Sequence, residues 1–337
     1  MPTPGAPPLL VRLPNWLGDL VLAWPVVSAA ARGPVLFVGP SAFEALLRAR
    51  HPRAAYLSWS RDRRFALVGA IRRARPRAAL LLTDSLSSAL LVALAGVPER
   101  IGYAAEGRGP LLTHRVARGA PARTTPRAAE YRRLAQAARL APDANEPRLE
   151  AIEAERRAAQ EMLARLRAPA GAAEPYLVVA PGAAYGPAKQ WGGDRFGEAA
   201  AALARTRGWD VVAVGARGDR AEAGAVLAHV ARRGIRALDA TGETDLPTLT
   251  GVLAGASLVL TNDSGVMHLA AALRRPTVAV FGSTSPVWTS SSAPWVANRY
   301  AGYPCSPCYR RTCPIGYGCL RAVDVGGVVE AGVRLLG

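Results

Sequence analysis

The segment from Pro14 to Asp19 reads Pro-Asn-Trp-Leu-Gly-Asp and holds groups that could bind a polar substrate and take a proton from it. It lies between an apolar run at 9–13, expected to be a strand, and a helical pattern at 20–31. Loops at this place in a parallel α/β domain point into the ligand crevice, and Gly18 permits a close backbone approach. Asp19 therefore has two possible roles, as a cap of the following helix or as a general base for a substrate hydroxyl.

A single lysine, Lys189, stands among 42 basic residues, so the other 41 are arginines. Lysine and arginine are not interchangeable where a compact charge must contact a phosphate at a single point. Lys189 follows a loop of small residues at 181–188, directly after an expected strand. Because residues such as Gly182 let a ligand approach the backbone, we interpret this loop as a diphosphate site. It matches neither a P-loop nor the dinucleotide fingerprint, and an ordinary strand-to-helix loop is the alternative.

A third polar segment, 261–268, reads Thr-Asn-Asp-Ser-Gly-Val-Met-His and also joins an expected strand to a helix. The N-terminus of a helix offers free N–H groups and a partial positive charge to a phosphate. Asp263, Ser264 and Gly265 would surround that N-terminus, with His268 one turn into the helix. The alternative is that Asp263 or Ser264 is a plain helix cap and that His268 belongs to the core.

All four cysteines fall within 15 residues, at Cys305, Cys308, Cys313 and Cys319, with the spacing C-x2-C-x4-C-x5-C. In a reducing compartment, clustered thiols with this spacing are more typical of a zinc site than of disulfides. Packed free thiols remote from catalysis are the alternative. No histidine accompanies them, so nothing indicates a catalytic cysteine, and we assign no metal to the chain.

Two series of alternating strands and helices must position these segments, as expected for parallel α/β domains. In the first half we expect strands at 9–13, 35–38 and 79–83, and helices at 20–31, 43–50, 65–73, 87–95, 129–140 and 149–166. In the second half we expect strands at 176–180, 210–215, 258–261 and 277–281, and helices at 194–207, 219–233, 246–254, 265–272 and 325–336. The polar stretch at 106–127, rich in arginine and proline, is a candidate acceptor loop.

The Ala-, Gly- and Pro-rich link at 167–175 predicts a domain boundary, which gives domains 1–170 and 171–337. Two domains also agree with the length, because 337 residues exceed what one hydrophobic core usually holds. Ligands of such domains bind at the carboxyl ends of the strands, so we expect a cleft between the domains. The last helix, at 325–336, could pack back on the first domain.

Positive charge is concentrated in the first domain. Residues 1–170 hold 26 basic and 13 acidic side chains, and the remainder holds 16 and 12. Such a field attracts nucleic acid, an acidic membrane surface, or a substrate that carries carboxylates and phosphates. The first apolar run is broken at Pro14, unlike a signal peptide, and the longest apolar stretch is interrupted by Asp84 and three serines. We therefore expect a cytoplasmic protein.

Taken together, five groups of motifs resemble glycosyltransferase family 9, in the family's order and over nearly the whole chain. They are 11–19, 84–88 with 95–103, 181–183 with 188–191, 261–268, and 281–286. The resemblance implies a GT-B fold, with two Rossmann-like doubly wound domains. It further implies an N-terminal acceptor domain, a C-terminal domain that binds ADP-heptose, and inverting transfer without a metal or other cofactor.

The resemblance also implies roles for single residues. Asp19 matches the general base that deprotonates the acceptor hydroxyl, and Lys189 matches the residue that stabilises the departing ADP. The residues that match the donor site are Gly182, Lys189, Asp263, Ser264, Gly265 and His268, with Asp219 as a carboxylate for the ribose. The chain departs from the family at Gln190 and Gly192, where members commonly have a basic residue and a proline.

The acceptor implied by the resemblance is the inner core of lipid A, whose Kdo carboxylates and phosphates suit an arginine-rich domain. We expect Asn15, Gly18, Arg61 and Arg64 to contact it, and Arg63, Arg72 and Arg73 are further candidates. A peripheral contact with the inner membrane follows, since the acceptor sits there. The alternatives are a family 9 enzyme with another nucleotide sugar or glycan, and a nucleic-acid-binding protein. The latter rests on charge alone, and we expect no nucleic-acid partner.

Overall fold

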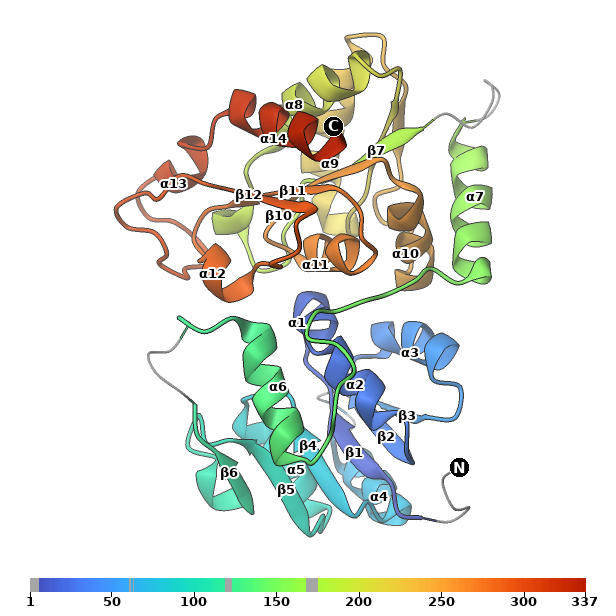
Figure 1. The fold of residues 1–337 in the computed structure, drawn as a ribbon, viewed down its shortest axis with the longest axis vertical. Coiled ribbons are helices and arrows are strands. Elements are labelled where there is room, and N and C mark those ends of the chain that lie inside the picture. Colours follow the sequence, from blue (N-terminus) through green and yellow to red (C-terminus); the bar gives the residue numbers. More distant parts are fainter. Residues whose placement is uncertain (1–5, 61, 63, 119–122, 168–174) are drawn as a thin grey trace. The chain divides into compact units, whose positions relative to one another are not determined.

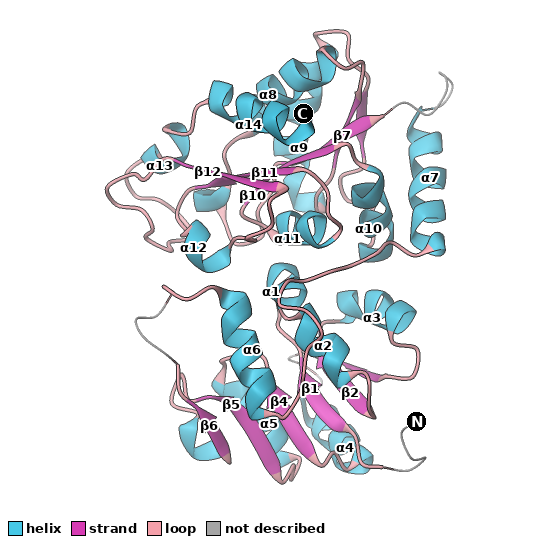
Figure 2. Ribbon diagram, viewed as in Figure 1, coloured by secondary structure: helices cyan, strands magenta, loops and turns pink. Residues whose placement is uncertain are grey.

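The computed structural model describes residues 6–60, 62, 64–118, 123–167 and 175–337 (Figure 1). The chain divides into two compact units, Met1–Pro147 (unit 1) and Arg148–Gly337 (unit 2). Each unit is an α/β domain built on one parallel sheet with helices on both faces (Figure 2). The two doubly wound domains expected from the sequence are thus confirmed. The cleft between them stays a prediction.

Unit 1 has a six-stranded sheet with the order β3-β2-β1-β4-β5-β6. Its strands are β1 (Leu9–Arg12), β2 (Val35–Gly39), β3 (Ala55–Ser58), β4 (Ala78–Leu81), β5 (Glu99–Tyr103) and β6 (His114–Val116). Its helices are α1 (Leu17–Leu22), α2 (Trp24–Ala30), α3 (Glu44–Arg50), α4 (Arg64–Ala74), α5 (Leu86–Leu94) and α6 (Arg127–Ala137). Helices α4 and α5 lie on one face of the sheet, and α2 and α6 lie on the other (Figure 1).

Unit 2 repeats this topology with the order β12-β11-β10-β7-β8-β9. Its strands are β7 (Tyr176–Ala180), β8 (Asp210–Ala213), β9 (Ala237–Asp239), β10 (Leu258–Asn262), β11 (Thr277–Phe281) and β12 (Val296–Tyr300). Its helices are α7 (Glu153–Arg167), α8 (Gly193–Arg205), α9 (Arg220–Ala231), α10 (Leu246–Gly255), α11 (Gly265–Ala272), α12 (Pro286–Thr289), α13 (Gly318–Arg321) and α14 (Val325–Leu336). The central strands are buried on both faces, which explains their continuous apolar runs.

The first helix differs from the prediction. The pattern at 20–31 predicts one helix, whereas the structure has α1 and α2, separated at Ala23. Pro25 explains the break, because proline has no N–H to donate and clashes with the preceding turn inside a helix. The consequence is that α1 is a short helix whose first turn carries Asp19.

Helix α7 accounts for a difference in the domain division, which falls after Pro147 and not at residue 170. The helix packs closely on α10, so that a β-carbon at Gly251 would lie 2.0 Å from the backbone oxygen of Glu155. At its end, Arg167 forms a buried ion pair with Asp210, with Nε and Oδ2 2.9 Å apart. The predicted boundary at 170–171 lies outside the described residues. Helix α14 packs on α8 and on β11 and β12 of unit 2, so its apolar face is buried in its own unit.

Among the described residues, no helix combines the length and the apolar character needed to cross a membrane.

Candidate active site

The polar segments follow the central strands of each sheet. In unit 1, the segment with Asp19 follows β1, and Asp84 follows the neighbouring strand β4. In unit 2, the loop with Lys189 follows β7, and Asp263 follows its neighbour β10. Each pair of strands is the point where the strand order reverses, since the chain winds outward from it in both directions. Doubly wound sheets bind their ligands at this switch point.

Asp19 lies in the first turn of α1, with 28% of its side chain exposed. The N-cap of α1 is Trp16, so the carboxylate does not cap the helix. Instead, its Oδ1 accepts hydrogen bonds from the hydroxyl of Tyr131 at 2.7 Å and from Nε of Arg127 at 3.2 Å. Within the part of the chain that the structure describes, Oδ2 accepts none. One oxygen therefore orients the carboxylate, and the other is left for an external proton donor.

Tyr131 is a hydrogen-bond donor because its phenol is kept protonated. The side chain is buried in α6, and burial together with the nearby Asp19 carboxylate raises its pKa well above the usual value. Its ring also lies under the guanidinium of Arg127, with Cζ 4.8 Å from the ring centroid. The two residues are one turn apart on α6 and hold Asp19 together.

A network of charges fixes α6 to the loops after β1 and β4. Arg127 donates to Glu130 at 2.6 Å and lies 3.6 Å from Asp84, in addition to its bond with Asp19. Arg118 bonds Asp84 and lies 3.6 Å from Glu130. Among the described residues, the network includes Asp19, Asp84, Glu130, Arg108, Arg118 and Arg127. Three carboxylates and three guanidinium groups balance, so a partly buried cluster is tolerated.

Asn15 precedes Asp19 in the same segment, and its side chain is held by the buried Arg12. Its Oδ1 accepts a hydrogen bond from Nη2 of Arg12 at 2.7 Å. Arg12 is buried at the end of β1, where burial lowers its pKa to about 10, and its guanidinium stacks on Trp59. The structure thus brings Asn15, Gly18 and Asp19 together in one loop and turn. Of the other predicted acceptor residues, Arg61 lies outside the described residues, and only the backbone of Arg64, which begins α4, is described.

In unit 2, Lys189 and Asp263 form a close ion pair. Nζ of Lys189 lies 2.6 Å from Oδ2 of Asp263, which also accepts hydrogen bonds from the hydroxyls of Thr284 at 2.6 Å and Thr289 at 3.1 Å. Burial opposes ionisation, but the charges of Lys189 and His268 lower the pKa of Asp263 below its usual value. Asp263 is therefore a buried anion that holds the ammonium of Lys189 in place.

Asn262 connects the two ends of the loop that carries Lys189. Its side-chain oxygen accepts from the backbone N–H of Trp191 at 3.0 Å, and its amide nitrogen donates to the carbonyl of Pro181 at 2.7 Å. Asn262 is fully buried at the end of β10. The sequence segment 261–268 contains this residue, but its role as the link between two loops was not predicted.

The N-terminus of α11 is open to a ligand. Ser264 is the N-cap, yet its side chain makes no hydrogen bond to a helix N–H; its hydroxyl lies 3.1 Å from that of Thr261. Asp263 precedes the cap and points to Lys189. The alternative that Asp263 or Ser264 is a plain helix cap is therefore wrong, because neither side chain caps the helix. His268 is buried one turn into α11, close enough to Asp263 to affect its ionisation.

Gly182 and Asp219 are in direct contact. A β-carbon at Gly182 would lie only 2.1 Å from Cγ of Asp219. Asp219 itself closes the loop after β8, since its Oδ2 accepts the N–H of Ala216 at 2.8 Å. The structure thus gives Asp219 a structural task beside the loop after β7, and its contact with a ribose stays a prediction.

We expect Gly182→Ala to destabilise unit 2 by about 1–3 kcal/mol, because overpacking must displace either the loop or Asp219. The measurement is urea unfolding of the two variants beside the parent protein. Gly218→Ala is the matched control, since nothing lies within 4 Å of a β-carbon there. Equal stability of the two variants would contradict the contact.

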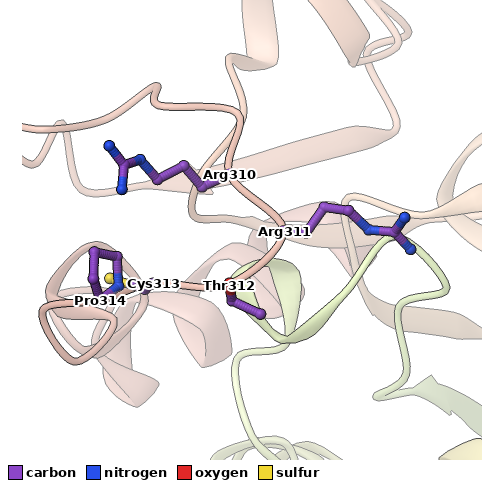
Figure 3. Close-up of a pocket in the computed structure, with 5 residues that line it drawn as sticks. All are labelled: Arg310, Arg311, Thr312, Cys313 and Pro314. Carbon is purple, nitrogen blue, oxygen red and sulfur yellow. The ribbon is translucent and has the colours of Figure 1, made fainter.

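The segment with the cysteines supports the loop of Lys189. Nε of Arg311 donates to the carbonyl of Tyr185 at 2.7 Å, and the carbonyl of Arg311 accepts the N–H of Ala188 at 3.0 Å. The ring of Tyr185 lies 5.1 Å from Nζ of Lys189. In Figure 3, Arg310 and Arg311 point to opposite sides of a shallow surface depression that they line with residues 312–314. Arg311 was not among the predicted site residues.

The four cysteines are free thiols in different surroundings. Cys305 and Cys308 are exposed, Cys313 is half-buried and Cys319 packs in the core of unit 2. Among the described residues, no three His, Cys, Asp or Glu side chains are arranged as metal ligands. The backbone N–H of Tyr317 donates to Sγ of Cys313 at 3.3 Å and lowers the pKa of that thiol, whereas burial raises the pKa of Cys319.

Known proteins are similar to this chain in sequence and in fold. Lipopolysaccharide heptosyltransferase 2 of Escherichia coli (strain K12) is 30% identical over 301 residues, which cover 83% of this chain and 84% of the relative. The enzyme of the same name from Salmonella typhimurium gives the same identity and coverage. The solved structure of E. coli ADP-heptose LPS heptosyltransferase II matches with a TM-score of 0.77 and 26% identity over 98% of both chains, which confirms the GT-B fold. A family model described as glycosyltransferase family 9 (heptosyltransferase) matches residues 64–317, and the chain belongs to this family.

Proposed function

We propose that the protein is an inverting, metal-independent heptosyltransferase. It moves a heptose from ADP-L-glycero-β-D-manno-heptose to the first heptose of the lipopolysaccharide inner core. The relatives named lipopolysaccharide heptosyltransferase 2 support heptose transfer in lipopolysaccharide synthesis, and the solved ADP-heptose LPS heptosyltransferase II supports ADP-heptose as the donor. The observation that carries the proposal is the Asp19 carboxylate, held through Oδ1 by Tyr131 and Arg127 while Oδ2 accepts nothing from the described chain.

In the proposed reaction, Oδ2 of Asp19 takes the proton of the acceptor hydroxyl as its oxygen attacks the anomeric carbon of the donor. The bond between that carbon and the phosphate oxygen breaks, and ADP leaves with the electron pair. Attack from the side opposite the leaving group converts the β-linked donor into an α-linked product. General base catalysis of this kind contributes roughly 10²–10⁴-fold to a rate.

Unit 2 supplies the groups that stabilise the departing ADP. The ammonium of Lys189 has three N–H bonds, and its contact with Asp263 uses one of them. The remaining two can meet diphosphate oxygens, together with the free N–H groups at the start of α11. These fixed positive groups take the place that a divalent cation has in other transferases. We therefore expect EDTA to leave the rate unchanged.

The test of the function is release of ADP from ADP-heptose in the presence of heptosyl-Kdo2-lipid A. Turnover with the β anomer, and none with the α anomer, is the expected result, and NMR of the product should show an α linkage. Absence of turnover with the correct anomer would refute the proposal. A thermal-shift comparison identifies the nucleotide, since ADP should raise the melting temperature more than UDP or GDP.

On the acceptor side, Asn15, Gly18 and the arginines of unit 1 are proposed to contact the anionic core. The acceptor is a membrane lipid, so the enzyme works at the cytoplasmic face of the inner membrane and touches it peripherally. The loss of Asn15 should raise the KM for the acceptor and leave the KM for ADP-heptose unchanged.

Tyr131→Phe tests the positioning of Asp19. The variant loses the 2.7 Å hydrogen bond to Oδ1, so the carboxylate is held by Arg127 alone. We expect kcat to fall by roughly 10- to 100-fold with little change in either KM, because misorientation of a catalytic group lowers the rate without weakening binding. Steady-state kinetics measures this split. Tyr176→Phe is the matched control, since it also removes a buried hydroxyl bond, to the carbonyl of Val252 in unit 2.

A further inference from the structure

Helix α5 exposes a stripe of leucines that none of the described residues of unit 1 covers. Leu86, Leu90 and Leu94 are 48%, 43% and 49% exposed. They are four residues apart, so they lie along one face of the helix over about 12 Å. The opposite face, with Ala89, Leu91 and Val92, packs in the core. An apolar stripe of this kind on a charged domain marks an interaction site.

Positive charge accompanies the stripe. Helix α4 packs beside α5, and Arg72 donates from Nε and Nη2 to the carbonyl of Leu94, at 3.1 and 2.6 Å. Arg73, Arg75 and Arg77 follow and are all exposed. Helix α5 itself carries no charged residue. Leucines flanked by arginines are typical of a face that rests on an anionic membrane surface, where the apolar side chains enter the headgroup boundary and the cations meet the lipid phosphates.

The stripe also begins next to the acceptor side of the candidate active site. Leu86 follows Asp84 by two residues, and Asp84 and Asp19 both contact Arg127, at 3.6 and 3.2 Å. The stripe therefore begins at the carboxyl end of β4, the end of the sheet that also carries the Asp19 segment, although α5 and α6 cover opposite faces of that sheet.

We propose that the outer face of α5, with Leu86, Leu90 and Leu94 and the adjoining arginines at positions 72, 73, 75 and 77, binds an anionic lipid bilayer. This rests on the proposed function only in that the acceptor is lipid-linked. A second copy of the chain is a poorer occupant, because its own stripe is accompanied by the same positive charge. A bilayer that contains phosphatidylglycerol has the opposite charge.

The test is flotation of the full-length protein with vesicles of phosphatidylcholine, with and without phosphatidylglycerol. The parent protein should bind the anionic vesicles, less so at high salt. The triple variant Leu86→Gln, Leu90→Gln, Leu94→Gln should bind them at least about tenfold more weakly. Arg73→Gln should reduce the preference for anionic lipid. Val333→Gln, at an exposed apolar position of α14 in unit 2, is the matched control and should bind like the parent.

Two further measurements separate this inference from the proposed function. The triple variant should transfer heptose to a delipidated, water-soluble acceptor at the parent rate, while its rate on acceptor in vesicles falls. Vesicle binding that depends on the leucines, in a protein without transferase activity, would leave the inference standing and refute the function. Binding by the triple variant equal to that of the parent would overturn the inference, and so would a parent dimer that the triple variant abolishes. Leu90→Gln alone, with circular dichroism of each variant, guards against misfolding.

Discussion

Asp19→Asn should lower kcat by about 10³-fold and leave ADP affinity within twofold of the parent value. Asparagine has the same shape and can still accept the hydrogen bond from Tyr131, so the loop should keep its structure. It cannot take a proton from the acceptor hydroxyl at neutral pH. The reaction would then depend on water as the base.

Steady-state kinetics and calorimetric ADP titration measure the two quantities in the Asp19 experiment. Asp143→Asn is the matched control, because it removes a carboxylate of unit 1 that is 82% exposed and pairs with Arg32 on the surface. Its rate should equal that of the parent. An Asp19→Asn enzyme that keeps the parent rate would eliminate this carboxylate as the base.

Lys189→Met should lower kcat by about 10²–10³-fold, because the variant removes a positive charge from the place where ADP acquires its negative charge. Lys189→Arg should lose less, since the charge remains but the planar guanidinium meets the phosphate differently. Single-turnover rates with ADP-heptose measure the effect. A methionine variant that is as fast as the parent would show that Lys189 does not act on the leaving group.

The Lys189 experiment needs a stability control. Methionine leaves the buried Asp263 without its 2.6 Å partner, which by itself should cost about 3–5 kcal/mol of folding free energy. The double variant Lys189→Met, Asp263→Asn removes both charges and should regain much of that stability. Its transfer rate should nevertheless stay low. If the double variant recovered both the transfer rate and the stability, Lys189 would have only a structural role and would not act on the leaving group.

The sequence predicted the central strands of both sheets and missed the edges. The strands at 176–180 and 277–281 agree with β7 and β11 because strands buried on both faces form continuous apolar runs. The edge strands β3, β6, β9 and β12 are three to five residues long and are only partly buried. So short a run, with His114 or Arg299 inside it, cannot be told from a loop by pattern alone. Strand β5, which begins with two polar residues, was missed for the same reason.

The residues of the candidate site were predictable where they follow a buried strand in the sequence. Asp19, Lys189 and Asp263 could be chosen because each lies in the segment that follows a central strand at a switch point of the sheet, and Lys189 is also the single lysine of the chain. Tyr131, which orients Asp19, is 112 residues away, and Arg311, which supports the Lys189 loop, is 126 residues from Tyr185. Neither belongs to a local pattern. Only the packing of α6 and of the cysteine segment brings them to the site.

The ion pair of Lys189 with Asp263 involves the only side-chain primary amine of the chain. Guanidinium groups do not react with amine acylating reagents under mild conditions, so acylation would neutralise Lys189 at the proposed donor site while the arginines of α4 kept their charge. The charge of Lys189 can therefore be changed chemically without a change in the charge of the arginines. Acetylation would remove the positive charge of Lys189, whereas the arginines keep theirs across the whole physiological pH range.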